Sequence, residues 1–343
     1  MRGKRRNAPE LPDASAGTPE ERRERARQDF TFFRRAYFPH YCLVGGDSRL
    51  HEWLDTELPR MADAPEGVRL AIAAPRGEAK STFVSLFFVL WAVLTGRKHY
   101  ILIIADALEQ AASLLGAVKD ELEFNEALKR DFPGAGKGHV WNVGTVVTPG
   151  NVKIQALGAG KRMRGLRHGP HRPDLIVLDD LENDGNVDKP EQRDKLQSWL
   201  QKTVLNLGAA DGSMDVVYVG TLLHYDSVLA RTLRKPLWKA RTFRSILRWP
   251  DRMDLWDEWE SLLSSRGEAE ARRFYRQHRA KMEAGAEVSW PASRPLYRLM
   301  CLRAEDREAF DSEQQNDPLS ANEAPFNGCI TFWVDRSRDW LLF

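Results

Sequence analysis

Residues 75–82 have the types and spacing that bind a polyphosphate. They read Pro-Arg-Gly-Glu-Ala-Lys-Ser-Thr, follow the apolar run 70–74 and precede an apolar helix candidate. In a strand–loop–helix unit of this kind, backbone N–H groups and the helix dipole face the anion, the lysine reaches the β- and γ-phosphates, and the hydroxyl binds Mg²⁺. The expected nucleotide-binding residues of this phosphate loop are Arg76, Gly77, Glu78, Ala79, Lys80, Ser81 and Thr82.

The phosphate loop departs from the usual pattern at its two glycine positions. Ala74 and Ala79 stand where the pattern has glycines, which let the backbone approach the phosphates closely. Glu78 adds a negative charge nearby. Taken alone, the loop fits either a nucleotide site or an ordinary strand-to-helix turn with an exposed lysine.

A second motif, residues 173–182, joins a buried strand to carboxylates. Four apolar residues, 175–178, run into Asp179, Asp180 and, after a leucine, Glu182. Open α/β sheets bind their ligands at the carboxyl ends of such strands. Asp179 would hold Mg²⁺, and Asp180 or Glu182 would orient and deprotonate the attacking water. The alternative is a solvated acidic turn, but the two motifs support each other as halves of one site.

A third motif follows the apolar strand 216–219. That strand ends in Gly220-Thr221, and His224 comes three residues later. Thr221 and His224 are candidates for sensing the γ-phosphate and relaying its loss to the next segment. His224 taken alone would be a surface or capping histidine.

A basic loop, residues 158–172, precedes the acidic strand. It is rich in glycine, and its cationic residues, uninterrupted by acids, are Lys161, Arg162, Arg164, Arg167, His168, His171 and Arg172. Such a loop can contact DNA phosphates or deliver an arginine to the nucleotide of a neighbouring subunit. Arg164 is the first candidate for that arginine and Arg162 the second. A merely solvated loop is the alternative.

Short aliphatic runs alternate with helical stretches, which predicts a mainly parallel sheet covered by helices. The expected strands are residues 68–74, 100–105, 152–157, 175–178 and 216–219, with a hairpin joining 145–148 to 152–157. Helices are expected from Thr18 toward Arg35 and over residues 83–94, 106–130, 189–207 and 255–283. The strand 100–105, between the two nucleotide motifs, indicates an α/β P-loop NTPase of the additional-strand type.

The pattern divides the chain into four expected parts. Residues 1–45 would form a basic arm and an N-terminal helix, 46–235 the nucleotide-binding core, 236–320 a small helical lid, and 321–343 a linker. No apolar run approaches the roughly 20 residues that a membrane span needs, so no membrane partner is expected. The 343 residues carry a net charge of +2, so a polyanion would be bound by local patches, and the three cysteines lack metal-ligand spacing.

In their order along the chain, these motifs resemble the large subunit of tailed-phage terminases, the motors that package viral DNA. The likeness rests on residues 75–82, Arg162-Met163-Arg164-Gly165, residues 172–180, residues 220–226 and Gln314-Gln315-Asn316-Asp317-Pro318. It covers about residues 50–343. The family joins an additional-strand ATPase domain, through a small lid, to an RNase H-like nuclease.

The resemblance implies an ATPase that uses ATP and Mg²⁺ and translocates double-stranded DNA into a procapsid. Lys80 would bind phosphates, Ser81 with Asp179 would hold Mg²⁺, and Arg76 would couple γ-phosphate release to motion. Asp180 stands where the family commonly has a glutamate, so Glu182 is the alternative catalytic carboxylate. The implied partners are further copies in a ring, expected to be a pentamer, the portal protein and the small terminase subunit, in the host cytoplasm on the procapsid.

Residues 338–343 look like the first strand of the family's nuclease, and no later acidic cluster follows. The expectation is therefore a motor half without nuclease activity. Two other functions stay open: a helicase-like or DNA-repair ATPase of the same fold, and a nucleotide-binding assembly protein that does not hydrolyse ATP.

Overall fold

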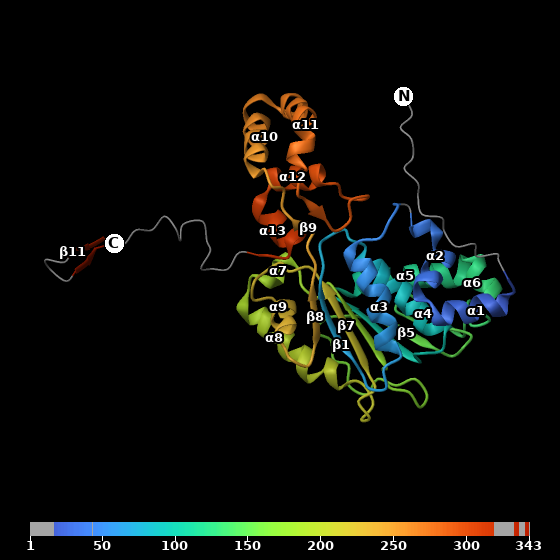
Figure 1. Cartoon of the computed structure of the whole chain (residues 1–343). Coiled ribbons are helices and arrows are strands. Elements are labelled where there is room, and N and C mark those ends of the chain that lie inside the picture. The colour runs from blue at the N-terminus through green and yellow to red at the C-terminus, as the bar shows by residue number, and fades with distance from the viewer. Residues whose placement is uncertain (1–16, 43, 319–332, 336–339, 343) are drawn as a thin grey trace.

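The apolar runs of the sequence form an eight-stranded sheet at the centre of the computed structural model (Figure 1). The structure describes residues 17–42, 44–318, 333–335 and 340–342. In order across the sheet, the strands are β3 (Val140–Trp141), β4 (Thr145–Val147), β5 (Lys153–Gly158), β2 (Tyr100–Ala105), β6 (Leu175–Asp179), β7 (Asp215–Gly220), β1 (Arg69–Ala73) and β8 (Lys239–Thr242). From β5 to β8 all neighbours are parallel, whereas β3 and β4 run antiparallel at one edge.

The predicted fold class is confirmed. All five predicted strands are present to within one residue at either end, and β4 pairs with β5 as the predicted hairpin. The phosphate-loop strand β1 and the acidic strand β6 are separated in space by β7. The strand 100–105, from which the additional-strand type was predicted, is β2 and lies on the far side of β6, so the interposed strand is a different one from that expected. Strand β8 was not predicted, and its four residues are all exposed.

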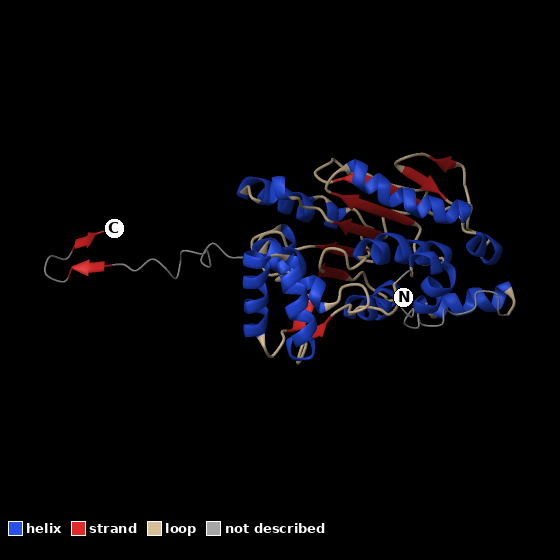
Figure 2. Cartoon of the chain, turned by 90° about the horizontal axis from the view of Figure 1, so that it is seen from above, coloured by secondary structure: helices blue, strands red, loops and turns tan. Residues whose placement is uncertain are grey.

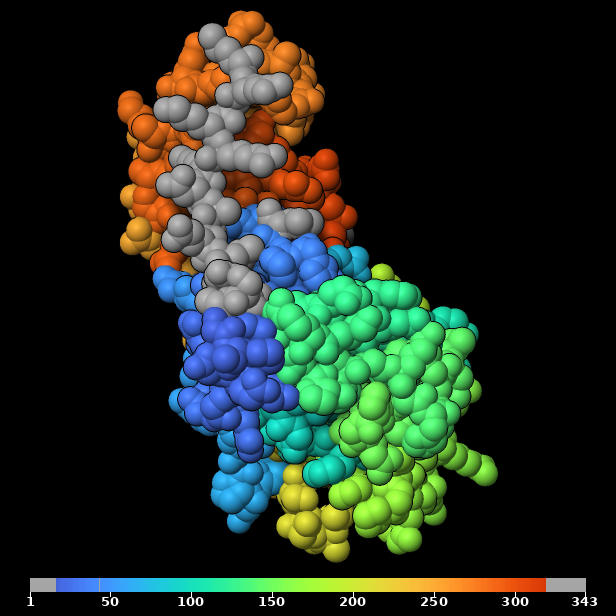
Figure 3. Space-filling view, turned by 90° about the vertical axis from the view of Figure 1, so that its right-hand side faces the viewer, coloured from blue at the N-terminus to red at the C-terminus, as the bar shows by residue number. Residues whose placement is uncertain are grey.

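One face of the sheet is covered by helices from the first half of the chain, and Figure 3 displays the N-terminal helices of this layer in dark blue. They are α1 (Pro19–Gln28), α2 (Phe30–Tyr37), α3 (Arg49–Ala62), a π-helix η2 (Thr82–Phe88), α4 (Val89–Leu94), α5 (Leu108–Phe124) and α6 (Glu126–Asp131). Leu70 and Ile72 of β1 point into this layer, as strand alternation requires. Burying such aliphatic side chains contributes about 1.5–3 kcal/mol each.

The opposite face packs against a thinner layer, so the sheet is sandwiched between helices when seen from above (Figure 2). This layer consists of α7 (Asp184–Val187), α8 (Pro190–Lys202), the 3₁₀-helix η3 (Val204–Asn206) and α9 (Val228–Leu233). Ala71 and Ala73 of β1 face it. Because both faces are buried, the central strands read as continuous apolar runs in the sequence.

Three predicted helical stretches proved to be pairs of helices, and in two of them a polar residue ends the first helix and caps the second. Asp29 separates α1 from α2, and its carboxylate accepts a hydrogen bond from the N–H of Phe32, 2.8 Å away. Asn125 separates α5 from α6 and caps Leu128 in the same way, at 3.2 Å. The prediction of continuous helices was wrong there, since a side chain that accepts from N3 begins a new helix.

Residues 246–315 form a separate lobe, called the lid below, at the edge of the sheet where the central parallel strands end (Figure 1). The lid was predicted over 236–320, but residues 239–242 form β8 of the central sheet instead. Its elements are β9 (Ile246–Arg248), α10 (Met253–Arg266), α11 (Glu268–Met282), β10 (Glu287–Val288), α12 (Leu296–Glu305) and α13 (Arg307–Gln315). Its core is aromatic: Trp256 and Trp259 are buried and pack edge to face, 5.5 Å apart. Gly267, at a φ of +84°, divides the predicted helix 255–283 into α10 and α11.

Past residue 318, the described residues form two short antiparallel strands, β11 (Trp333–Asp335) and β12 (Trp340–Leu342). The predicted linker spans residues 321–343, and apart from these two strands it lies outside the described residues. The predicted basic arm before residue 17 also lies outside them. In the part of the chain that the structure describes, every helix is too short or too polar to cross a bilayer.

Candidate active site

The phosphate loop has a sharply turned backbone despite its alanines. Gly77 has a φ of +79° and Ala79 a φ of +55°, both in the left-handed region. Ala79 therefore holds the conformation that glycine adopts more readily, at a cost of roughly 1–2 kcal/mol. The helix begins at Lys80, directly after this turn, so its first N–H groups point toward the loop.

Lys80 lies at the centre of the site, between two strand ends. Its ammonium donates a hydrogen bond to Thr221 Oγ1, 2.9 Å away after β7, and lies 3.3 Å from Asp180 Oδ2 after β6. The Thr221 hydroxyl in turn donates to the carbonyl of Ala74 at 3.2 Å. Three motifs that are far apart in sequence thus meet at one edge of the sheet.

Asp179 is held by two hydroxyls of the helix that follows the phosphate loop. Ser81 Oγ donates to one carboxylate oxygen at 2.9 Å, and Ser85 Oγ donates to the other at 2.5 Å. The carboxyl is fully buried, and this burial, with the repulsion from Asp180, raises the pKa of Asp179 to about 6. Ser85 was missed by the sequence analysis, although it follows Ser81 by four residues and so lies on the same helix face.

These groups fit a magnesium ion. No Lys, Arg or His nitrogen lies within 4.0 Å of the Asp179 carboxylate in the described residues, and the more distant Lys80 and the two serine hydroxyls compensate its buried charge only in part, so a cation would stabilise it. Ser81 supplies a hydroxyl oxygen beside it. The described residues contain no group of three or more His, Cys, Asp or Glu arranged for a metal. An ion here would complete its shell with phosphate oxygens and water, as magnesium commonly does.

Asp180 has a strained backbone and lies open to the site. Its φ is +45°, and its side chain is 33% exposed beside Lys80. Gly220 gives it room, because a Cβ there would lie only 3.3 Å from Asp180 Oδ1. Left-handed non-glycine residues tend to mark functional positions. Asp180 is therefore partly exposed at the site and paired with Lys80.

Glu182, the alternative catalytic carboxylate, is engaged elsewhere. Its two oxygens accept hydrogen bonds from the N–H groups of Val228 at 2.7 Å and Leu229 at 3.0 Å, in the first turn of α9. The Tyr218 hydroxyl donates to it at 3.2 Å. Burial raises the pKa of Glu182, while these hydrogen bonds act against that rise. The contacts describe a carboxylate that stabilises a helix N-terminus.

The remaining predicted residues of the loop are arranged around its outer side. Arg76 is exposed and forms an ion pair with Glu313 of α13, at 2.8 Å. Glu78 is buried and accepts from Ser289 Oγ at 3.2 Å, so the carboxylate is turned toward the lid. The hydrogen bond from Ser289 partly compensates the negative charge that Glu78 adds to the phosphate loop.

His224 has only local partners among the described residues. Its Nδ1 accepts from the N–H of Asp226 at 3.0 Å, and its ring stacks on Tyr225 with centroids 4.3 Å apart. Burial and the nearby Arg193 lower its pKa. The structure therefore brings Thr221 into contact with Lys80, but it does not do so for His224.

Arg162 and Arg164 are exposed, and neither forms an ion pair with another described residue. The basic loop that carries them is anchored from within. Met163 between them is buried, and the Trp199 indole of α8 donates to the carbonyl of Lys161 at 2.9 Å. Both arginines are thus held on the surface by a fixed backbone, accessible to another molecule.

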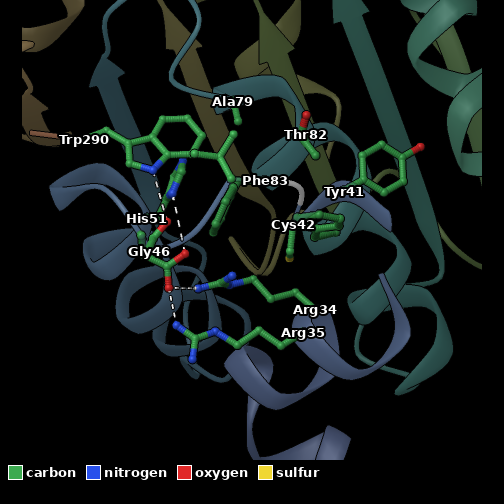
Figure 4. A pocket seen from close by; sticks show the side chains of 13 residues that line it. Arg34, Arg35, Tyr41, Cys42, Gly46, His51, Ala79, Thr82, Phe83 and Trp290 are labelled. Atoms are coloured by element: carbon green, nitrogen blue, oxygen red, sulfur yellow. Dashed lines mark hydrogen bonds and ion pairs between the residues drawn. The ribbon is translucent and has the colours of Figure 1, made fainter. Parts of the chain in front are cut away.

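An apolar hollow opens beside the phosphate loop (Figure 4). Its lining includes Ala79 and Thr82, and its aromatic walls are formed by the side chains of Tyr41, Phe83, Phe87 and Trp290, with His51. The His51 ring stacks on Phe83 at 4.3 Å, and its Nε2 donates to the carbonyl of Glu78 at 2.9 Å. Arg34, Arg35 and Asp47 also line this hollow, so aromatic and charged side chains both border it beside the phosphate loop.

Comparisons with known proteins give fold-level matches alone. No protein-family model matches the sequence, and no curated protein matches it. Among solved structures, the large terminase ATPase domain of Thermus phage P74-26 is similar, with 14% identity, coverage of 76% of this chain and 92% of that chain, and a TM-score of 0.35. An arginine-to-alanine variant of that domain is similar with 14% identity, coverage of 75% and 90%, and a TM-score of 0.34.

Proposed function

We propose that this chain hydrolyses ATP with Mg²⁺ at the carboxyl edge of its sheet and that it is the motor half of a viral DNA-packaging machine. The observation that supports the ATPase most directly is the convergence of Lys80, Asp180 and Thr221, beside the Ser81–Asp179 pair. Cation, hydroxyls and carboxylates lie at the end of a phosphate loop, as phosphoryl transfer requires.

In this proposal each group has a separate task. The loop amides and Lys80 bind the phosphates, and the base enters the hollow between Tyr41 and Trp290. Ser81 and Asp179 would hold magnesium, which would supply positive charge for the phosphates. Asp180 orients the attacking water and accepts its proton, because Glu182 is committed to α9.

An arginine from a neighbouring subunit would complete the site. Charge develops on the transferred phosphoryl group in the transition state, and a guanidinium that arrives from outside stabilises it. Arg164, with Arg162 as the alternative, is suited to this task because it is exposed, unpaired among the described residues and carried by an anchored loop.

The motor function rests on the order of the motifs in the sequence, which resembles that of the large terminase subunits. It implies a ring of copies on a portal protein, a small terminase subunit that selects the DNA, and a grip on double-stranded DNA through phosphates. Such a grip weakens as salt rises, because binding releases counterions from the DNA and this release is less favourable at high salt.

Replacing Lys80 by alanine tests the site. We expect kcat/KM for ATP hydrolysis to fall by at least about 100-fold, because a charge that stabilises the transition state is lost. Lys129→Ala, on the exposed side of α6, is the matched control and should hydrolyse ATP as the wild type does. Turnover that Lys80→Ala leaves unchanged would reject the site.

The same preparation separates the other two functions. Nucleotide binding by calorimetry without any turnover would favour an assembly protein. Strand separation that requires no portal would favour a helicase-like enzyme.

A further inference from the structure

Consecutive residues of the phosphate loop contact the lid. The N–H of Arg76 donates to the carbonyl of Glu313 at 2.9 Å, in addition to the ion pair between their side chains. Two residues later, Glu78 accepts from Ser289 Oγ. Glu313 lies in α13 and Ser289 follows β10, so both partners belong to the lid.

Gly77, between these residues, is covered by a third lid residue, Arg294. A Cβ built at Gly77 would lie 1.8 Å from Arg294 Nη2, so the guanidinium rests directly on the loop backbone. Only a glycine permits this approach, and the φ of +79° also favours glycine at that position. The glycine at position 77 thus accommodates both the contact with Arg294 and the turn.

The Arg294 side chain is held by a hydrogen bond to α13. Its Nη1 donates to Gln314 Oε1 at 2.5 Å, and the same oxygen accepts from Ser245 Oγ at 3.0 Å. Two residues along, Asn316 Oδ1 accepts from the N–H of Leu222 at 2.9 Å, in the segment that follows Thr221. The C-terminal end of α13 therefore contacts both sides of the site, the phosphate loop and the segment after β7.

The charges at this contact are incompletely compensated. No carboxylate oxygen lies within 4.0 Å of the Arg294 guanidinium in the described residues, and desolvation lowers its pKa. Glu78 Oε1 is buried without a hydrogen-bond partner. A contact of this kind is sensitive to added charge, because buried groups are poorly screened. Phosphates bound on the inner side of the loop would change the field that Arg294 and Glu78 experience.

We propose that Arg294 is a positioning residue that latches the lid to the phosphate loop, so that polyphosphate binding and lid position are coupled. The coupling rests on the proposed nucleotide site, whereas the latch itself does not. By reciprocity, a residue that links the two must alter nucleotide affinity when it is removed, even though it touches the loop rather than the nucleotide.

The test compares Arg294→Ala with Arg276→Ala, an exposed arginine of α11 without a partner among the described residues. Amide hydrogen exchange of the full chain without nucleotide should be faster over residues 74–82 in Arg294→Ala and unchanged in Arg276→Ala. The ratio of the Kd values for ADP and a non-hydrolysable ATP analogue should shift by about fivefold or more in Arg294→Ala alone. Arg294→Lys, which keeps the charge but loses the two-pronged contact, should give intermediate values and serves if the alanine variant does not fold.

Exchange over residues 74–82 that matches the wild type in a folded variant would overturn the latch. Faster exchange with an unchanged affinity ratio would overturn the coupling. If the wild type binds no nucleotide, the proposed function fails and the coupling with it, but the exchange measurement still decides whether the latch exists.

Discussion

At the scale of single residues, the surroundings of Asp179 disfavour its charged form. The carboxyl is fully buried next to a second aspartate, and its two hydroxyl donors do not offset the loss of water, so its pKa rises to about 6. An isolated fold gains nothing from such a group. In the proposed nucleotide site, such a group would be preorganised to bind magnesium.

The pH dependence of stability follows from that shift. The pKa of Asp179 in the folded chain, about 6, lies above its value of 3.8 in the unfolded chain. The folded state therefore holds the proton more tightly. The contribution of this proton to the free energy of unfolding is complete below about pH 4 and is lost as pH rises through 6. The loss reaches about 3 kcal/mol at neutral pH.

Asp179→Asn removes this dependence. In magnesium-free buffer at pH 7.5, we expect the variant to have a free energy of unfolding about 2 kcal/mol above that of the wild type, after about 1 kcal/mol is lost with one serine hydrogen bond. At pH 4 the advantage should vanish. Denaturant titrations at both pH values measure it, with the exposed Asp257→Asn as control. A gap between the two proteins that does not change with pH contradicts the assignment.

At the scale of elements, two carboxylates from one strand end serve different structures. Asp180 faces Lys80, whereas Glu182 accepts from the N–H groups of Val228 and Leu229 at the start of α9. A short helix such as α9 depends on such partners for its first amides. The two acids should therefore separate in their effects on catalysis and stability.

Paired amide substitutions test this separation. Asp180→Asn should lower kcat for ATP hydrolysis by roughly 100-fold or more and change the free energy of unfolding little. Glu182→Gln should lower the free energy of unfolding by about 1–2 kcal/mol, because a charged acceptor of two backbone N–H groups is lost. Steady-state kinetics and denaturation of the same samples decide. A large loss of kcat in folded Glu182→Gln with an active Asp180→Asn would reverse the assignment.

The helices and strands also differ in how well the sequence predicted them. The central strands were predictable, because burial on both faces leaves uninterrupted apolar runs such as residues 101–104. Strand β8 was not, since its exposed Lys and Arg residues have no strand pattern and only pairing with β1 defines it. The breaks at Asp29 and Asn125 were missed, because each residue occurs inside an otherwise helical stretch.

The candidate site divides in the same way. Lys80, Ser81 and Asp179 were assigned from motifs, and their proximity follows from parallel strands that end at one edge. The choice between Asp180 and Glu182 depends on partners some 46 residues away in sequence, which no local pattern contains. Arg294 was not predicted for the same reason: its contact with Gly77 joins positions more than 200 residues apart.

At the scale of the whole molecule, the proposed function needs a second cation at the site, and the exposed basic loop carries two candidates. Within the described residues, Lys80 is the cation in contact with the site carboxylate Asp180, while Arg162 and Arg164 form no ion pair. The net charge of +2 gives no long-range field for polyanions, so function must depend on local contacts. In the proposed ring, the loop of one copy would lie at the site of the next, because head-to-tail interfaces form rings when the rotation closes.

Mixing two inactive variants tests this arrangement. Arg164→Ala and Lys80→Ala should each hydrolyse ATP at least about 100-fold more slowly than the wild type, because each lacks one charge of the transition-state site. In a randomly mixed ring of both, roughly one site in four combines an intact Lys80 with a neighbour's intact Arg164. Specific activity should therefore recover to roughly a quarter of the wild-type value at protein concentrations that support assembly. The doubly substituted chain, Lys80→Ala with Arg164→Ala, is the control, since mixing it with Arg164→Ala provides no arginine for any site. Recovery with that control, or none in the first mixture although the subunits assemble, would mean that Arg164 does not act between subunits.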